Sequence, residues 1–242
     1  MFSFLINIFD IFLYRPLFNS LILIYNYLPI SDFGLAIICL TVIIRFILYP
    51  VSVKAFNSQR ALQKLQPQLQ EVQKKYKNNK EKQTQELLSL YRREKINPFS
   101  SLFLVIAQFP ILIALYRVFW LGLKPEELSN LYVFVSNPGH INSVFLNITN
   151  LANPHNLLFA VLAGVLQFFQ TKMSMPKLGN KEKKDKSINL LIQKQMIYFF
   201  PIITIAVLYS LPSALSLYWI TSGFFSIIQQ YFVMKKDRLV NL

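Results

Sequence analysis

The sequence predicts an all-α polytopic membrane protein with five transmembrane helices and a cytoplasmic antiparallel helical hairpin. The chain of 242 residues is 54 % apolar, yet its formal net charge is +14. Soluble domains are roughly 45–50 % apolar and mix charges of both signs. Here long uncharged runs alternate with lysine-rich segments, and the uncharged runs approach the ~20 residues that a helix needs to cross the hydrocarbon layer. Segregated charge of this kind is typical of a multi-span membrane protein.

Residues 1–30 form the first apolar segment, but Asp10, Arg15 and Pro16 interrupt it. A helix with two charges and a proline crosses a membrane poorly and suits the boundary between lipid and water. We therefore expect an amphipathic interfacial helix at residues 1–30, and an additional span is the alternative.

Five further apolar runs predict the transmembrane helices. The first span is expected at residues 31–51, and residues 98–242 are expected to hold the other four. Within that second part, the apolar runs lie at 100–120, 156–171, 195–211 and 213–234. The polar segments are a long one at 52–97, a loop at 172–194 and a short basic tail at 235–242.

The orientation follows from where the basic residues lie. Segment 52–97 carries eleven lysines and arginines against four glutamates, and loop 172–194 carries seven lysines against two acids. The loop between the second and third spans holds only Lys124, with Glu126 and Glu127. Cytoplasmic loops are enriched in lysine and arginine. We therefore expect the basic segments in the cytoplasm, the amino terminus outside and the carboxyl terminus inside.

The long basic segment has an apolar pattern of its own. Its first half repeats apolar residues with alternating spacings of three and four, at Leu62, Leu65, Leu69, Val72 and Tyr76. This spacing is the seam of a coiled coil. A second seam at 84–91 follows a polar turn, so segment 52–97 is predicted to form a hairpin of two helices. Pro67 is expected to start or kink the first of them. The alternative is a charged linker without fixed structure.

Arg45 lies in the middle of the first expected span. It is eleven residues after Gly34 and nine before Lys54, or ~16 Å and ~13 Å along a helix. An arginine at this depth costs ~2.5–3.5 kcal/mol on insertion scales, so it normally faces water or a polar partner. The alternative is a side chain that extends toward the cytoplasmic surface.

No carboxylate lies in the apolar run of any expected span, so Arg45 has no partner for an intramembrane ion pair. The neutral candidates are Thr41, one turn earlier, Gln108 in the second span, Gln167 and Gln170 in the third, and several serines and threonines in the last two. Each amide could simply join two helices. Together they indicate a hydrated cavity that accepts an acidic or polar group arriving from elsewhere, which is a substrate site.

The sequence lacks the patterns that identify metal or catalytic sites. The single cysteine, Cys39, lies in an apolar run and can form no disulfide within the chain. His140 and His155 have no partners at metal-ligand spacing. No phosphate-binding glycine loop is present. We expect no metal, no cofactor, no enzymatic activity and no specific nucleic-acid partner, whereas the positive charge suits anionic lipids.

The sequence resembles the YidC family of membrane protein insertases, with its mitochondrial Oxa and chloroplast Albino relatives. The resemblance covers nearly the whole chain beyond the first ten residues or so. It rests on "TVIIRFILYP" at 41–50, "LQPQLQEVQKKYKNN" at 65–79, "QELLSLYRREKINP" at 85–98, "QFPILIALY" at 108–116, "FFQTKMS" at 168–174 and "LPSALSLYWITSGFFSIIQQ" at 211–230. Pro212-Ser-Ala214 and Gly223 depart from the usual family residues, which affects the packing of these helix ends.

The resemblance implies a five-helix core around a hydrophilic groove. Carried over by position, its substrate-groove residues are Arg45, Thr41, Gln108, Tyr218 and Trp219, and Gln167 joins them by its place in the third span. The implied function is the insertion and folding of nascent membrane proteins in the bacterial cytoplasmic (inner) membrane. Further implied partners are the ribosome, the Sec translocon and the signal-recognition-particle receptor. The alternative is an assembly chaperone without translocation activity; a permease is disfavoured because no intramembrane carboxylate is present.

Overall fold

The computed structural model describes residues 2–97, 100–121, 125–175 and 188–240, and helices dominate these residues. The predicted helical class is therefore confirmed. The helices are α1 (Phe2–Phe9), α2 (Arg15–Tyr27), α3 (Phe33–Ile47), α4 (Tyr49–Lys75), α5 (Lys80–Arg93), α6 (Ser100–Leu121), α7 (Leu157–Ser174), α8 (Ile188–Tyr209) and α9 (Ser213–Val240). A π-helical turn η1 (Asp10–Tyr14), a 3-10 turn η2 (Pro125–Asn130) and two short antiparallel strands, β1 (Val144–Phe145) and β2 (Thr149–Asn150), complete the fold.

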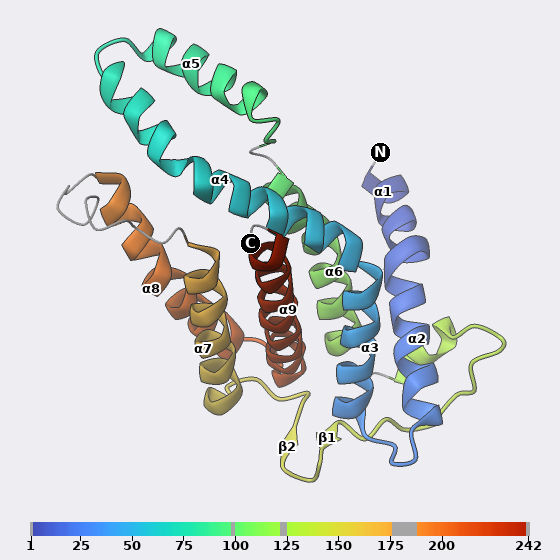
Figure 1. The fold of residues 1–242 in the computed structure, drawn as a ribbon. Helices are drawn as coiled ribbons and strands as arrows, with labels where there is room; N and C mark the ends of the chain where they lie inside the picture. Colours follow the sequence, from blue (N-terminus) through green and yellow to red (C-terminus); the bar gives the residue numbers. More distant parts are fainter. Residues whose placement is uncertain (1, 98–99, 122–124, 176–187, 241–242) are drawn as a thin grey trace.

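The helices form a bundle with a hairpin at one end (Figure 1). Helices α3, α6 and α9 lie in its centre, α1 and α2 cover one side, and α7 pairs with α8 on the other. The α4–α5 hairpin projects from one end, where α1 begins and α9 ends. The strands β1 and β2 lie at the opposite end. The bundle thus has a hairpin end and a strand end.

The amino-terminal segment contains a helix that fits the alternative prediction of an additional span. Ile6–Tyr27 is a continuous helical stretch that is, by length and composition, long and apolar enough to cross a membrane. Pro16 does not break it, because the π-helical turn η1 directly before it takes up the irregular hydrogen bonding that a proline inside a helix requires. An interfacial position for residues 1–30 stays a prediction, with the span as its alternative.

The first expected span is a bent pair of helices. The side chain of Asp32 starts α3 by accepting a hydrogen bond from the Leu35 amide at 2.9 Å. Helix α3 ends at Ile47, and α4 leaves it at an angle of 64°. Pro50 in the first turn of α4 explains the break, since a proline cannot extend the hydrogen bonds of a preceding helix.

The segment at 52–97 contains the helical hairpin that the apolar seams predicted. Leu65 and Leu69 of α4 are buried against Leu90 of α5, with Val72 and Leu87 packed around them. Pro67 does not start the first helix, because α4 continues from Tyr49 to Lys75 on both sides of it. That this hairpin lies in the cytoplasm stays a prediction.

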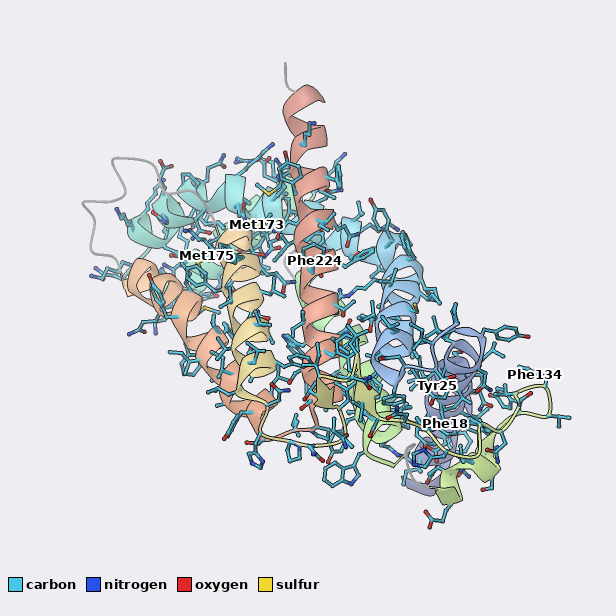
Figure 2. The ribbon with its side chains drawn as sticks, turned by 90° about the horizontal axis from the view of Figure 1, so that it is seen from below. Phe18, Tyr25, Phe134, Met173, Met175 and Phe224 are labelled. Carbon is cyan, nitrogen blue, oxygen red and sulfur yellow. The ribbon has the colours of Figure 1, made fainter. Side chains whose placement is uncertain are left out.

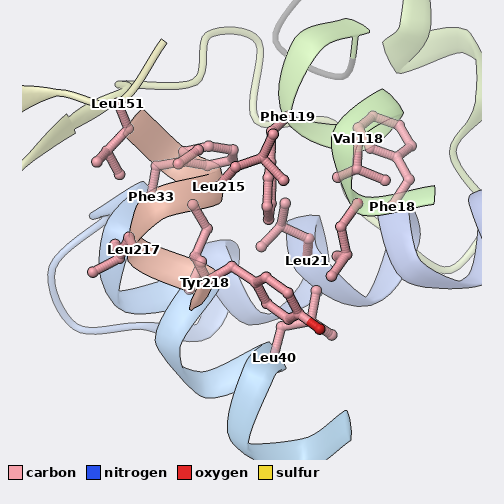
Figure 3. Packing of buried hydrophobic residues seen from close by; sticks show 14 of the residues in the cluster. Phe18, Leu21, Phe33, Leu40, Val118, Phe119, Leu151, Leu215, Leu217 and Tyr218 are labelled. Atoms are coloured by element: carbon pink, nitrogen blue, oxygen red, sulfur yellow. The ribbon is translucent and has the colours of Figure 1, made fainter. Parts of the chain in front are cut away.

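One apolar core joins α2, α3, α6 and α9. Phe33 of α3 and Phe119 of α6 meet edge to face, with ring centroids 6.3 Å apart. Leu215 and Tyr218 of α9 and Leu21 of α2 complete this core (Figure 3). Outside it, apolar side chains are exposed over much of the molecule, as on α6 at Ile106, Phe109, Ile113, Tyr116 and Trp120. Such a surface is expected of helices that face lipid rather than water.

Among the described residues, Ile6–Tyr27 and Leu157–Ser174 are each apolar and long enough to cross a membrane, and the bent α3–α4 pair is a third candidate. Gln108–Trp120 and Gln195–Tyr209 are shorter apolar helices. Helix α9 is less apolar because it buries serine and glutamine side chains, at Ser213, Ser216, Ser222, Ser226, Gln229 and Gln230. The number of five spans stays a prediction.

Candidate functional site

Arg45 lies in the last turn of α3 and reaches across to α9. Its Nε donates a hydrogen bond to the hydroxyl of Ser222 at 2.7 Å, and its Nη2 donates to the same oxygen. The partner is neutral, as the absence of carboxylates from the apolar runs required. The sequence did not single out Ser222, although the serine repeat at 222 and 226 on α9 was a usable signal, because it places two hydroxyls on one helix face.

Tyr218 and Gln108 extend the same group of side chains. The amide nitrogen of Gln108 in α6 donates to the Tyr218 hydroxyl, which also contacts Ser222 one helical turn further along α9. Tyr218 is buried, whereas Arg45 and Gln108 keep part of their surface exposed. We call Arg45, Gln108, Tyr218 and Ser222 the Arg45 cluster. It links three helices, α3, α6 and α9, by hydrogen bonds.

Trp219 and Gln167 form a second pair on a different face of α9. The indole nitrogen of Trp219 donates to the side-chain oxygen of Gln167 in α7 at 3.4 Å. Successive helix residues point about 100° apart because an α-helix has 3.6 residues per turn. Tyr218 therefore faces α6 and Trp219 faces α7. Tyr218 and Trp219, predicted as an aromatic pair, thus make contacts with two different helices.

Thr41 has a local partner. It is buried, and its hydroxyl donates to the carbonyl oxygen of Ile37 in its own helix at 2.6 Å. Threonine commonly satisfies its hydroxyl in this way inside a helix. Thr41 therefore does not join the Arg45 cluster, and its place in a groove stays a prediction.

The face of α9 that carries Ser222 continues as a buried polar row toward the hairpin end. Ser226 and Gln230 are buried on it, and the Ser226 hydroxyl and the Gln230 side-chain oxygen have no hydrogen-bond partner in the described part of the chain. The amide nitrogen of Gln230 donates to the Ser174 hydroxyl of α7 at 3.2 Å. Buried polar atoms normally have a partner, so these oxygens are acceptors that water or a polar ligand can use.

At the hairpin end, α4 is joined to α9 and α7. Gln229 of α9 and Ser52 of α4 are hydrogen-bonded at 2.8 Å, and both side chains are buried. Gln63 of α4 donates to the backbone oxygen of Ser174, the last residue of α7. The base of the hairpin is thus fixed across the ends of the two helices that carry Trp219 and Gln167.

Two hollows in the surface lie away from the Arg45 cluster. One, of about 310 Å³, is apolar and lies between α7 and α8, lined by Leu157, Ile202, Ile205, Ala206 and Tyr209. The other, of about 510 Å³, lies in the hairpin between Glu71, Glu86 and Arg93. A hydrophilic groove around Arg45 stays a prediction. Among the described residues, no group of three or more His, Cys, Asp or Glu side chains could hold a metal ion.

Arg117 is a second arginine in an apolar helix, and it was not among the predicted site residues. Its Nη1 lies 2.5 Å from the carboxylate of Asp10, and its guanidinium lies 4.5 Å from the ring centre of Tyr14. The Tyr14 hydroxyl donates to Glu127 at 2.7 Å. These contacts fix the amino-terminal helix to α6 and η2. The sequence did contain a signal for this ion pair, because Asp10 and Arg117 are opposite charges in two separate apolar segments.

Comparisons with known proteins match nearly the whole chain. The family model described as 60Kd inner membrane protein matches residues 23–239. The chain is 34 % identical over 207 residues to the membrane protein insertase YidC of Fusobacterium nucleatum, covering 86 % of this chain and 88 % of that protein. It is 34 % identical over 211 residues to the YidC of Clostridium tetani, covering 87 % and 85 %.

Some relatives are much longer than this chain. The YidC of Beijerinckia indica is 31 % identical over 245 residues, which cover 93 % of this chain but 37 % of that protein. A similar solved structure is an active YidC insertase crystal structure with the first transmembrane domain resolved. It has 27 % sequence identity and a TM-score of 0.57, and the match covers 90 % of this chain and 46 % of that one.

The resemblance read from the motifs is thereby confirmed, and the names of the family and its members indicate a bacterial membrane. The polar contacts of α3, α6 and α9 lie within the matched residues. The chain belongs to the 60Kd inner membrane protein family, whose similar members are YidC membrane protein insertases.

Proposed function

We propose that this protein inserts nascent membrane proteins into the bacterial inner membrane and helps them fold, without enzymatic chemistry. The observation that carries the proposal is the Arg45 cluster, in which an arginine within an apolar helix has a serine hydroxyl as its hydrogen-bond partner. The similarity to YidC insertases supports it. The cluster acts as a binding site for polar groups in transit.

Arg45 would hold the client by exchange of partners. A guanidinium carries five N–H donors, and hydrogen bonds to a carboxylate are roughly twice as strong as bonds to a neutral hydroxyl. An acidic or polar group of the client would therefore displace Ser222 from Arg45. Gln108 and Tyr218 would offer neutral hydrogen bonds beside it. Because Ser222 can return to Arg45 and the other two partners are neutral, the client can leave again.

The buried polar row of α9 supports a path to this site. It runs from Ser222 through Ser226 to Gln230, toward the hairpin end. A hydrophilic client segment would enter a groove along this row. The apolar client segment would move past α7 and α9, where Phe169 and Phe224 are exposed, and pass into lipid. Its transfer would be driven by removal of apolar surface from water.

We propose a cytoplasmic position for the hairpin, for loop 172–194 and for the carboxyl terminus, with five spans after residue 30. The excess of lysine and arginine in these segments supports this orientation. The hairpin would receive clients from the ribosome, the Sec translocon or the signal-recognition-particle receptor, and its lysines would contact anionic lipids.

The amino terminus was expected outside. In Figure 1 the segment α1–α2 begins at the hairpin end and runs antiparallel to α3. If Ile6–Tyr27 crosses the membrane in this arrangement, the amino terminus lies on the same side as the hairpin. We adopt this placement for the proposal.

The direct test is reconstitution of the purified protein alone in proteoliposomes with one short client whose translocated tail becomes protease-protected. A photoreactive residue at Gln108 or Trp219 should crosslink to the client while it is being inserted. Protection that does not rise above the level of empty liposomes would refute the proposal. Crosslinking to completed subunits alone, without nascent clients, would identify an assembly chaperone instead.

A further inference from the structure

The loop between η2 and β1 exposes two large apolar side chains. Val133 is fully exposed and Phe134 is 73 % exposed. The ring of Phe134 lies against that of Tyr132, at a centroid distance of 5.4 Å. Figure 2 shows Phe134 on a loop that extends beyond α2, away from the side chains of Phe18 and Tyr25. If this loop faced water, Val133 and Phe134 would expose apolar surface with no favourable free energy in return.

Both ends of this loop, residues 131–137, are hydrogen-bonded to α2. The Tyr132 amide donates to the side-chain oxygen of Asn19 at 2.6 Å, and the Asn19 amide nitrogen donates to the Asn130 carbonyl at 3.3 Å. Seven residues later on α2, the amide nitrogen of Asn26 donates to the Ser136 carbonyl at 2.7 Å. Positions seven apart lie on the same face of a helix, about 10 Å apart along its axis. Val133 and Phe134 lie between the two fastened points.

The depth of the loop in the membrane follows from the depth of α2. Asn19 and Asn26 belong to Ile6–Tyr27, which is apolar and long enough to cross the membrane. If this helix crosses, positions 19–26 occupy its last two turns at the strand end. If it lies flat at the surface, they are in the lipid–water interface. Both placements put the fastened loop at the level of the lipid.

The composition of the loop agrees with contact to lipid. From Ser129 to Asn156 the chain contains no Asp, Glu, Lys or Arg. Aromatic and apolar side chains without neighbouring charge, such as Tyr132, Val133 and Phe134, are stable at the lipid–water interface. Burial of apolar side chains in the acyl-chain region gives the loop its favourable free energy.

We propose that Val133 and Phe134 insert into the lipid leaflet at the strand end of the bundle and bind its acyl chains near the glycerol region. The loop 131–137 is then a membrane anchor for that end of the protein. The hydrogen bonds of Asn19 and Asn26 hold it at a fixed depth while the opposite end of the bundle handles clients. The inference does not depend on the insertase activity.

The test measures the depth of position 134. Single-cysteine variants Phe134→Cys, Lys77→Cys and Ile113→Cys are made in a Cys39→Ala background and labelled with the fluorophore NBD. Lys77 is exposed in the hairpin turn and serves as the water reference, and Ile113 is exposed on α6 and serves as the lipid reference. The proteins are reconstituted in vesicles of phosphatidylethanolamine and phosphatidylglycerol that contain lipids brominated at shallow or deep acyl positions.

NBD at position 134 should emit at shorter wavelength than NBD at position 77, and bromolipids should quench it several-fold more strongly. Shallow bromine should quench it more than deep bromine, the reverse of the order at position 113. An emission and a quenching equal to those at position 77 would overturn the proposal. Self-quenching that depends on protein density, without bromolipid quenching, would overturn it in favour of contact between two copies of the chain. Unlabelled Phe134→Ser, compared with the parent protein for release from vesicles by dilute detergent, gives a second readout: earlier release is expected.

Discussion

Arg45 and Ser222 are 177 residues apart in the chain, and the arginine Nε donates to the serine hydroxyl at 2.7 Å. This bond joins α3, the first helix after the amino-terminal segment, to α9, the last helix of the bundle. It also gives the arginine a neutral partner that a stronger acceptor can replace. Four predictions follow from this contact and from the packing around it.

Replacement of Arg45 by alanine should reduce the insertion of clients to an extent that depends on their charge. A hydrogen bond to a charged group contributes ~1.5–3 kcal/mol, and about 1.4 kcal/mol corresponds to a tenfold change in an equilibrium. We expect Arg45→Ala to lower insertion of clients with acidic translocated tails by about tenfold or more, and that of purely hydrophobic clients much less. Protease protection in proteoliposomes measures both. Arg45→Lys keeps the positive charge, so its insertion of clients with acidic tails should lie between that of the parent protein and that of Arg45→Ala. Equal loss for both client classes would contradict the proposed role.

Ser222 and Ser226 offer a matched pair of substitutions. Ser222→Ala removes the partner of Arg45, whereas the Ser226 hydroxyl has no partner among the described residues. Interhelical hydrogen bonds in membranes contribute about 0.6 kcal/mol on average and up to about 1.7. We expect Ser222→Ala to lower the free energy of unfolding by about 1 kcal/mol, as measured by denaturation in detergent micelles.

For Ser226→Ala the expected change in the same assay is near zero or stabilising. Replacement of an unpaired buried polar atom by an apolar one removes a desolvation cost. A larger loss from Ser226→Ala than from Ser222→Ala would mean that the Arg45–Ser222 bond contributes nothing to stability.

Two glycines test how closely α7 packs against its neighbours, Gly164 of α7 against α8 and Gly223 of α9 against α7. A methyl group added at Gly164 would lie 2.4 Å from the Ile205 side chain of α8 and 3.3 Å from the Pro201 carbonyl oxygen. At Gly223 it would meet only Leu166 at 3.4 Å. Small residues allow membrane helices to approach closely, and overpacking costs ~1–3 kcal/mol.

Gly164→Ala should therefore lower the midpoint of thermal unfolding, and Gly223→Ala should leave it nearly unchanged or raise it slightly. Fluorescence-detected size-exclusion chromatography after heating in detergent measures both midpoints. Equal midpoints for the two variants would show that Ile205 moves aside without cost.

The position of the amino terminus can be tested by thiol labelling. We expect a cysteine introduced at Ser3 in a Cys39→Ala background to react with a membrane-impermeant maleimide from the same side as a cysteine at Lys77 in the hairpin turn. The reason is that α1–α2 begins at the hairpin end of the bundle (Figure 1).

A cysteine at Asn147, in the turn between β1 and β2, should react from the opposite side. Labelling of Ser3→Cys together with Asn147→Cys would place the amino terminus outside. That result would restore the interfacial interpretation of residues 1–30.

Much of the fold could be predicted from the sequence because it depends on local patterns of apolar and polar residues. The spacing of Leu65 and Leu69 predicted a helix face, and the structure buries both against Leu90. Six short motifs taken together, the one around Arg45 among them, indicated the family. The effect of Pro16 was harder to predict, because it depends on the π-helical turn that precedes it, and the apolar pattern does not indicate such a turn.

The sequence by itself determined the helical class, the alternation of apolar and basic segments, and the absence of any carboxylate for Arg45 within the apolar runs. Those properties depend on composition and on spacing along one chain segment. Only the tertiary structure decided that Ser222 is the partner of Arg45, that Tyr218 and Trp219 face different helices, and that Asp10 pairs with Arg117. These contacts depend on the rotation and relative height of helices far apart in sequence. The periodicity of one helix defines its apolar face but not which neighbour meets its polar one.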